Sequence, residues 1–157
     1  MIRVLIVDDN ADVREALKRI IQKTSDIDVG GEAADGQEAL RMIDEQEWDV
    51  VLLDISLPDL SGLQVLKQTK RQRPNVRVLM VSVHPEEPYA ASALEAGASG
   101  YLTKDKAAEQ LAYAIRKVGT GSIYLSPRIA ERLGVKTTGD VARSQTEGTL
   151  RKTNSDS

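Results

Sequence analysis

Asp49-Val50-Val51-Leu52-Leu53-Asp54 is the stretch that decides the fold, because four consecutive apolar residues lie between two carboxylates. A run without alternation indicates a strand buried on both faces, as in a parallel sheet covered by helices. Similar runs occupy residues 2–7 and 76–82, and weaker ones are expected near 28–34 and 100–103. Amphipathic stretches with helical spacing separate these runs, so the sequence predicts five strand–helix units within residues 1–120.

The connections between these units leave few topologies open. Right-handed crossovers favour an α/β fold of the flavodoxin-like type, a doubly wound five-stranded parallel sheet of order 2-1-3-4-5 with helices on both faces. Such sheets bind ligands outside the carboxyl ends of their strands, at the switch point between the first and third strands. Asp9 or Asn10 is expected to cap the first helix, and Asp105 the last helix of this domain.

The character of the sequence changes after residue 120. We predict an α/β domain over residues 1–120, a linker with a short helix over 121–133, and a disordered tail over 134–157. Ser126-Pro127 indicates the short helix, because serine is a good N-cap and proline suits the first helical position. The tail is rich in Ser and Thr and has few apolar residues, which is typical of disorder.

Composition excludes several classes of function. The 157 residues are 41% hydrophobic and 29% charged, as in a globular soluble protein. With no Cys and one His, a disulfide scaffold and a thiolate metal site are excluded. A net charge of −3 and 3% aromatic residues argue against nucleic-acid binding by this chain. We expect no membrane span and no signal peptide, and therefore a cytoplasmic location.

Polar residues follow the carboxyl ends of the predicted strands. Asp8 and Asp9 follow the first strand, Asp54 follows the third, Ser82 ends the fourth, and Lys104 follows the fifth. Because the first and third strands flank the switch point, the three carboxylates are expected to meet in one cleft. Carboxylates about 4 Å apart repel by about 4 kcal/mol per pair at an effective dielectric near 20, so either one is protonated or a cation joins them.

These residue types favour phosphoryl transfer. Oxygen donors without nearby His or Cys favour Mg²⁺, which takes one or two carboxylates together with waters and phosphate oxygens. The Lys104 ammonium and the Ser82 hydroxyl suit an oxyanion, and an aspartate can itself accept a phosphoryl group. In such a site, catalysis comes mostly from positioning and charge neutralisation.

At these positions the sequence resembles the receiver domain of bacterial two-component response regulators, over about residues 2–120. The matching residues are Asp8, Asp9, Asp54, Pro58, Gly62, Ser82 and Lys104. The resemblance implies the CheY-like version of the predicted fold. It also implies that Asp54 takes a phosphoryl group from a sensor histidine kinase, with Mg²⁺ as the cofactor.

The resemblance assigns a role to each matching residue. Mg²⁺ would be bound by Asp9, Asp54 and the backbone carbonyl of Ser56, and by Asp8 through water. Lys104 would pair with the phosphoryl group.

The resemblance also implies a switch. Ser82 would bond a phosphoryl oxygen, and Tyr101 stands at the switch aromatic position, either as a ring that turns inward or as a static half-buried one. The face formed by the fourth helix, fifth strand and fifth helix would change. His84 is interpreted as a solvated loop residue.

Two further stretches are similar to the NarL/FixJ group, whose output is a LuxR-type helix-turn-helix. Lys104-Asp105 stands where many receivers have Lys-Pro, and residues 121–127 resemble the linker of this group. We expect the output domain to be absent from this chain, so that transcription regulation and DNA binding would need that missing C-terminal domain. A homodimer is possible.

Two alternatives stay open. A Mg²⁺-dependent aspartyl-phosphate phosphohydrolase would carry a second acid two residues after its nucleophile, where this chain has Ser56. A receiver-like binding module independent of phosphorylation would not need the full acidic set and Lys104. We therefore predict a signalling domain, and not an enzyme acting on a separate substrate.

Overall fold

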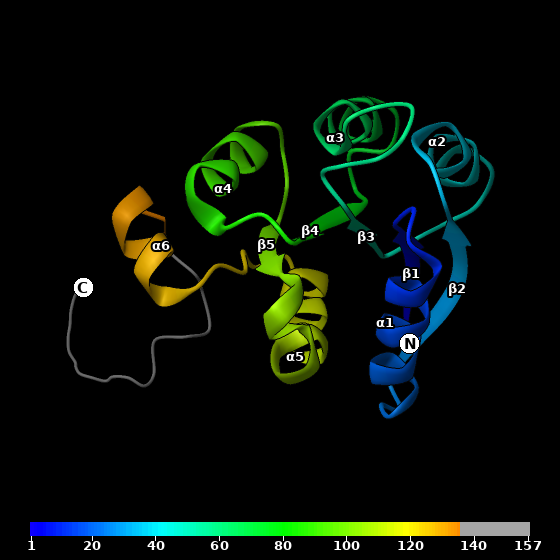
Figure 1. Ribbon diagram of the computed structural model, residues 1–157, viewed down its shortest axis with the longest axis horizontal. Helices are drawn as coiled ribbons and strands as arrows, with labels where there is room; N and C mark the ends of the chain where they lie inside the picture. The colour runs from blue at the N-terminus through cyan, green and yellow to red at the C-terminus, as the bar shows by residue number, and fades with distance from the viewer. Residues whose placement is uncertain (136–157) are drawn as a thin grey trace. The chain divides into compact units, whose positions relative to one another are not determined.

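The computed structural model describes residues 1–135, and its sheet has five parallel strands in the order β2-β1-β3-β4-β5 (Figure 1). The predicted topology is confirmed. In chain order the elements are β1 (Ile2–Val7), α1 (Ala11–Gln22), β2 (Ile27–Ala33), α2 (Gly36–Glu45), β3 (Val50–Leu53), α3 (Gly62–Gln72), β4 (Arg77–Ser82), α4 (Glu86–Glu95), β5 (Gly100–Thr103), the 3-10 turn η1 (Lys104–Lys106), α5 (Ala107–Gly119) and α6 (Pro127–Leu133).

Helices cover both faces of the sheet. Figure 1 shows α1 and α5 on one face and α2, α3 and α4 on the other. Val4 and Ile6 of β1 pack with Leu111 and Ile115 of α5 in a fully buried apolar cluster. Leu5, also fully buried, points to the opposite face because side chains alternate along a strand. The non-alternating strands are therefore buried on both sides, as their sequences predict.

The helix caps agree with the sequence at the first helix and differ at the fifth. The Asn10 side chain accepts hydrogen bonds from the N–H groups of Asp12 and Val13 at the start of α1. The predicted cap at Asp105 is wrong, because this residue lies inside η1 and α5 begins at Ala107 without a side-chain cap. The extra turn follows β5 directly and has Lys104 as its first residue.

Two consecutive glycines place a bulge in β2. Val4 pairs with Val29 and Leu5 pairs with Gly31, so Gly30 is an extra residue in the ladder. A Cβ at either glycine would lie 3.0 Å from the Trp48 ring, which shows that both face the same side of the sheet. A bulge of this kind shifts the alternation that follows it. Glu32, the next residue, is thereby returned to the face that α1 covers.

The chain divides into two compact units, and the first spans Met1–Tyr124. Its last residues line the free edge of β5, where the Tyr124 carbonyl accepts a hydrogen bond from the Tyr101 N–H at 3.0 Å. The second unit begins at Leu125 and includes α6, whose N-cap Ser126 accepts from the Ile129 N–H. The predicted disordered tail lies, from residue 136 on, outside the described residues. Within residues 1–135, no helix has both the length and the apolar character needed to cross a membrane.

Gly62 allows the loop after β3 to turn back on itself. Its N–H donates to the Ile55 carbonyl at 2.6 Å, and a Cβ at this position would lie 2.1 Å from the Asp54 carbonyl oxygen. No side chain fits at that distance. The glycine therefore fixes the path of the backbone next to Asp54.

We expect Gly62→Ala to lower the free energy of unfolding by about 1–3 kcal/mol, because the methyl group forces the loop away from Asp54. Urea unfolding followed by circular dichroism measures the change. Gly119→Ala is the matched control, since its Cβ would meet Ile2 at an ordinary 3.5 Å. Equal stability of Gly62→Ala and the wild type would contradict the proposed crowding.

Candidate functional site

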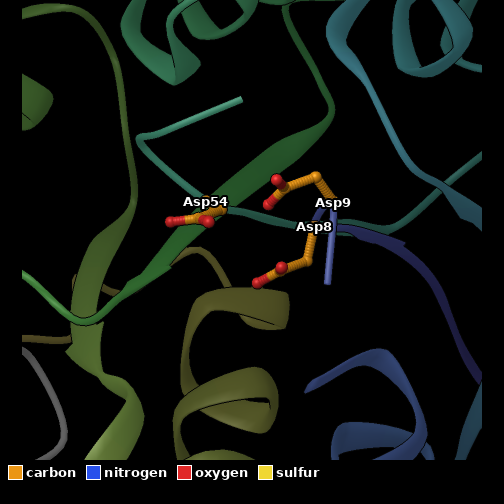
Figure 2. Close-up of side chains that lie close together, drawn as sticks. All are labelled: Asp8, Asp9 and Asp54. Atoms are coloured by element: carbon orange, nitrogen blue, oxygen red, sulfur yellow. The ribbon is translucent and has the colours of Figure 1, made fainter. Parts of the chain in front are cut away.

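Three carboxylates meet where β1 and β3 end (Figure 2). The register pairs Val7 with Leu53, and the Asp54 N–H donates to the Val7 carbonyl at 3.1 Å. Asp8 and Asp54 therefore leave the sheet side by side. One carboxylate oxygen each from Asp8, Asp9 and Asp54 lies within 4.8 Å of the other two. Asp8 and Asp54 are buried and Asp9 is exposed, so the cluster opens to solvent on one side only.

Lys104 supplies the positive charge of this cluster. Its Nζ lies 2.7 Å from Asp8 Oδ2 and 3.4 Å from Asp54 Oδ2. Burial acts to lower the pKa of Lys104, but its hydrogen bond and ion pairs with the two carboxylates outweigh burial and raise that pKa. Burial raises the pKa of Asp54 even though Lys104 opposes this effect.

The donor set fits a hard divalent cation. Three carboxylates converge, and among the described residues no His side chain joins them in a potential metal-binding group. Oxygen-only ligands are the kind that Mg²⁺ selects. The backbone carbonyl of Ser56 is also a predicted ligand of the metal. Ser56 lies two residues after Asp54, is exposed, and forms an isolated β-bridge with Ser61. The donor atoms of the cluster therefore suit Mg²⁺.

The Ser82 hydroxyl and the Tyr101 ring lie below the loop that follows β4. Both residues are buried, at 0% and 1% exposure. Ser82 Oγ accepts a hydrogen bond from the His84 N–H at 3.1 Å, and the Tyr101 hydroxyl donates to the His84 carbonyl at 2.9 Å. Burial raises the pKa of Tyr101 to about 12, so the phenol stays protonated and remains a donor. The ring lies inward in this structure, and its movement stays a prediction.

The His84 side chain contacts the site directly, which its position in the sequence does not indicate. Its imidazole Nε2 hydrogen bonds to Ser56 Oγ at 3.1 Å, and the ring lies against that of Tyr89 with centroids 4.8 Å apart and planes tilted by 35°. His84 is a partly exposed loop residue, and its side chain in addition joins the loops after β3 and β4. The sequence alone shows only that His84 stands two residues after Ser82.

Sequence reasoning also missed two residues that support the site from behind. Asp59 accepts hydrogen bonds from the N–H groups of Gly36 and Gln37 and so ties the loop after β3 to the start of α2. Arg14 on α1 donates to the carbonyl of Asp8 at 2.6 Å. The pattern of α1 identifies Arg14 as polar, but nothing in the sequence pairs it with a particular carbonyl.

A parallel sheet of this order that presents an acidic cluster and a lysine at its carboxyl edge defines the class of receiver domains. The chain belongs to this family, because residues 4–116 match the response regulator receiver domain. The predicted family and fold are confirmed.

Two curated relatives place the chain more narrowly. It is 38% identical over 136 residues to "Response regulator GacA" of Pseudomonas aeruginosa, a match covering 87% of this chain and 64% of the relative. It is 38% identical over 135 residues to "Response regulator UvrY" of Escherichia coli (strain K12), covering 86% of this chain and 62% of the relative. The chain thus spans less than two thirds of the length of these relatives.

Solved structures agree with this placement. A LuxR-family two-component response regulator from Aurantimonas superposes with a TM-score of 0.77 at 34% identity, covering 84% of this chain and 94% of that one. The receiver domain of a putative response regulator NarL from Mycobacterium tuberculosis has a TM-score of 0.73 at 34% identity, covering 76% and 97%. The predicted NarL/FixJ group is confirmed by these relatives and structures.

We expect Lys104→Met to lower the free energy of unfolding by about 2 kcal/mol, because it leaves the buried carboxylates of Asp8 and Asp54 without a cation. The value is set below that for a fully buried pair because the Lys104 side chain is 17% exposed. Chemical denaturation in EDTA at pH 7 measures it. Lys106→Met, an exposed lysine of the same turn, is the control, and an equal effect of both variants would refute the ion-pair argument.

Proposed function

We propose that Asp54 is the residue that accepts the phosphoryl group, and that a sensor histidine kinase is the donor. The observation that supports this most strongly is the convergence of Asp8, Asp9 and Asp54 within 4.8 Å, with the Lys104 ammonium on two of them. In the reaction, an Asp54 oxygen forms a bond to phosphorus and the bond from phosphorus to the kinase imidazole breaks. We assign stabilisation of the transferred oxygens to Lys104, whose Nζ lies 3.4 Å from Asp54 Oδ2, and to Ser82, which ends the neighbouring strand β4.

The charges of the site favour a divalent ion. Three carboxylates and one ammonium leave an excess of two negative charges, which one Mg²⁺ cancels. We assign the ion to Asp9, Asp54 and the backbone carbonyl of Ser56, with Asp8 acting through water. When bound, Mg²⁺ supplies charge neutralisation to the incoming phosphoryl group.

Phosphorylation would act on the rest of the molecule through Ser82. A phosphoryl group adds about −1.5 to −2 charges and three strong acceptors. A bond from the Ser82 hydroxyl to one of these oxygens would shift the loop that contains His84, and with it the Tyr101 contact. The α4-β5-α5 face would then change, with a coupling of about 1–3 kcal/mol.

The output of this switch follows from the relatives. Because the matched relatives are longer response regulators, we propose that the face controls dimerisation or a DNA-binding domain of the LuxR type, and that DNA is bound only through such a domain. We place the chain in the cytoplasm, where it meets the kinase. It would catalyse only its own phosphorylation and dephosphorylation, since Ser56 stands where a phosphohydrolase needs an acid.

Acetyl phosphate with Mg²⁺ is expected to add one phosphoryl group to the wild type, because Asp54 is the carboxylate that Lys104 and the acidic cluster surround. Intact mass spectrometry and a phosphotransfer assay with candidate kinases measure the label. We expect Asp54→Asn to abolish it and EDTA to suppress it.

Asp44→Asn is the matched control for this assignment. It makes the same chemical change at an exposed carboxylate on α2 and should be labelled as the wild type is. Equal labelling of Asp54→Asn and the wild type would refute Asp54 as the acceptor. Sustained turnover of a simple phosphate ester would favour the phosphohydrolase instead.

The Ser82→Ala variant is expected to be phosphorylated on Asp54, but phosphorylation should no longer change the structure around Tyr101 and α5. Without the hydroxyl, the phosphoryl group has no bond to the loop after β4, so the phosphorylation-dependent changes in the Tyr101 and α5 amide resonances should largely disappear. NMR spectra with and without acetyl phosphate test this, with Ser92→Ala on α4 as the control. Unchanged shifts in Ser82→Ala would contradict the switch.

A further inference from the structure

We propose that Arg14, together with Glu32 and Lys18, forms a positioning cluster that orients Asp8 and Asp9 toward the metal. This cluster of three residues is called the Arg14 cluster below. The inference rests on the proposed function, because it concerns the same metal site. It concerns residues of α1 and β2 that are outside the proposed set of metal ligands.

Arg14 connects three elements behind the carboxylates. Its Nη1 donates to the Asp8 carbonyl at 2.6 Å, and its Nε donates to Glu32 Oε1 at 3.0 Å. The side chain is 17% exposed, so both bonds lie in partly buried surroundings where they are stronger than at the surface. The planar guanidinium fixes the angle between its two acceptors, which a single ammonium does not.

Glu32 reaches Arg14 because of the glycine bulge in β2. If β2 ran through Gly30 in regular alternation and not as a bulge, Glu32 would lie on the opposite face of the sheet. In its actual position Glu32 accepts bonds from both Arg14 and Lys18, the latter at 2.8 Å. The hydrogen bond from Lys18 and that from Arg14 hold the pKa of Glu32 below its usual range, so the cluster stays ionised.

The Asp8 carbonyl, which Arg14 binds, lies in the turn after β1 that sets the direction of the Asp8 and Asp9 side chains. The Asp8 N–H donates to the Ala33 carbonyl at 3.1 Å, and Asp8 Oδ1 accepts from the Asn10 N–H at 2.9 Å. The Asp8 N–H is thus already bonded to Ala33, and Arg14 fixes the remaining backbone group of Asp8, its carbonyl. Because this carbonyl is hydrogen bonded, the peptide between Asp8 and Asp9 cannot rotate freely, and the two side chains keep their orientation.

Two substitutions at Arg14 separate positioning from charge. Arg14→Met removes the cation and both bonds, whereas Arg14→Lys keeps the cation but cannot hold both acceptors in the same geometry. Positioning predicts that both variants weaken Mg²⁺ binding, by about tenfold for Arg14→Met, the lower end of the loss that follows removal of a partner behind a metal ligand. Charge alone predicts that Arg14→Met binds Mg²⁺ more tightly and that Arg14→Lys is unchanged.

Isothermal titration with Mg²⁺ alone measures the dissociation constant, and thermal unfolding in EDTA measures stability without metal. Arg41→Met is the matched control, because it removes an exposed ion pair with Glu45 far from the acidic cluster. If Arg14→Met fails to fold, the charge-conserving Arg14→Lys decides between the two roles. Glu32→Ala, which frees one end of the guanidinium, should also weaken Mg²⁺ binding, but because it removes a negative charge this result counts only together with that of Arg14→Lys. We expect the loss of affinity to exceed anything seen in Arg41→Met.

The outcomes distinguish failure of the metal site from failure of the positioning role. If the wild type binds no Mg²⁺, the metal site itself is refuted and the positioning role with it. If the wild type binds Mg²⁺ and all three cluster variants bind it within twofold of the wild type, or Arg14→Met binds it more tightly, only the positioning role is refuted. Weaker binding in Arg14→Met and Arg14→Lys, with binding by Arg41→Met unchanged, supports the proposal.

Discussion

The mutual repulsion of three carboxylates at one edge of a parallel sheet is the constraint on which the rest of the structure depends. Asp8 and Asp54 are almost fully buried, so water does little to reduce their repulsion. Lys104 reaches both of them from the turn after β5. The site therefore exists only when β1, β3 and the turn after β5 are held in place by the sheet.

The structure meets this constraint by letting backbones approach closely where side chains would interfere. Gly62 brings the loop after β3 against the carbonyl of Asp54, and Gly100 brings the segment near Tyr124 against the edge of β5. The bulge at Gly30 has the opposite kind of effect, because it changes which face a later side chain uses. Gly62 thus positions a loop, Gly100 positions a segment at the sheet edge, and Gly30 positions the carboxylate of Glu32.

What the sequence predicts well is what depends on short-range pattern. Apolar runs identify the five strands, and because parallel strands share a carboxyl edge, the residues that follow them must meet. This reasoning places Asp8, Asp9, Asp54 and Lys104 together before any coordinates are known. It fails at Asp105, where the chain inserts a 3-10 turn before α5, since one residue type serves equally well as a cap or within a turn.

Contacts between distant elements could not be predicted for a related reason. The bond between Arg14 and Glu32 depends on the bulge, and the bond between His84 and Ser56 depends on how two loops fold over the sheet. A shift of one residue in either would turn the side chain away. Periodicity fixes the face of an element, but it does not fix which partner on the neighbouring element lies opposite.

In the proposed switch, the bonds around His84 would carry the effect of a phosphoryl group on Asp54 to the α4-β5-α5 face. The His84 backbone is bonded on one side to Ser82 and on the other to Tyr101, while its imidazole is bonded to Ser56. A new bond from the Ser82 hydroxyl would therefore act on a loop held by the ring contact of His84 with Tyr89 and by hydrogen bonds, which typically contribute about 0.5–1.5 kcal/mol each. On the proposed function, such bonds would be weak enough for a phosphoryl group to rearrange and directional enough to define two states. A rigid ion pair at His84 would resist the same perturbation.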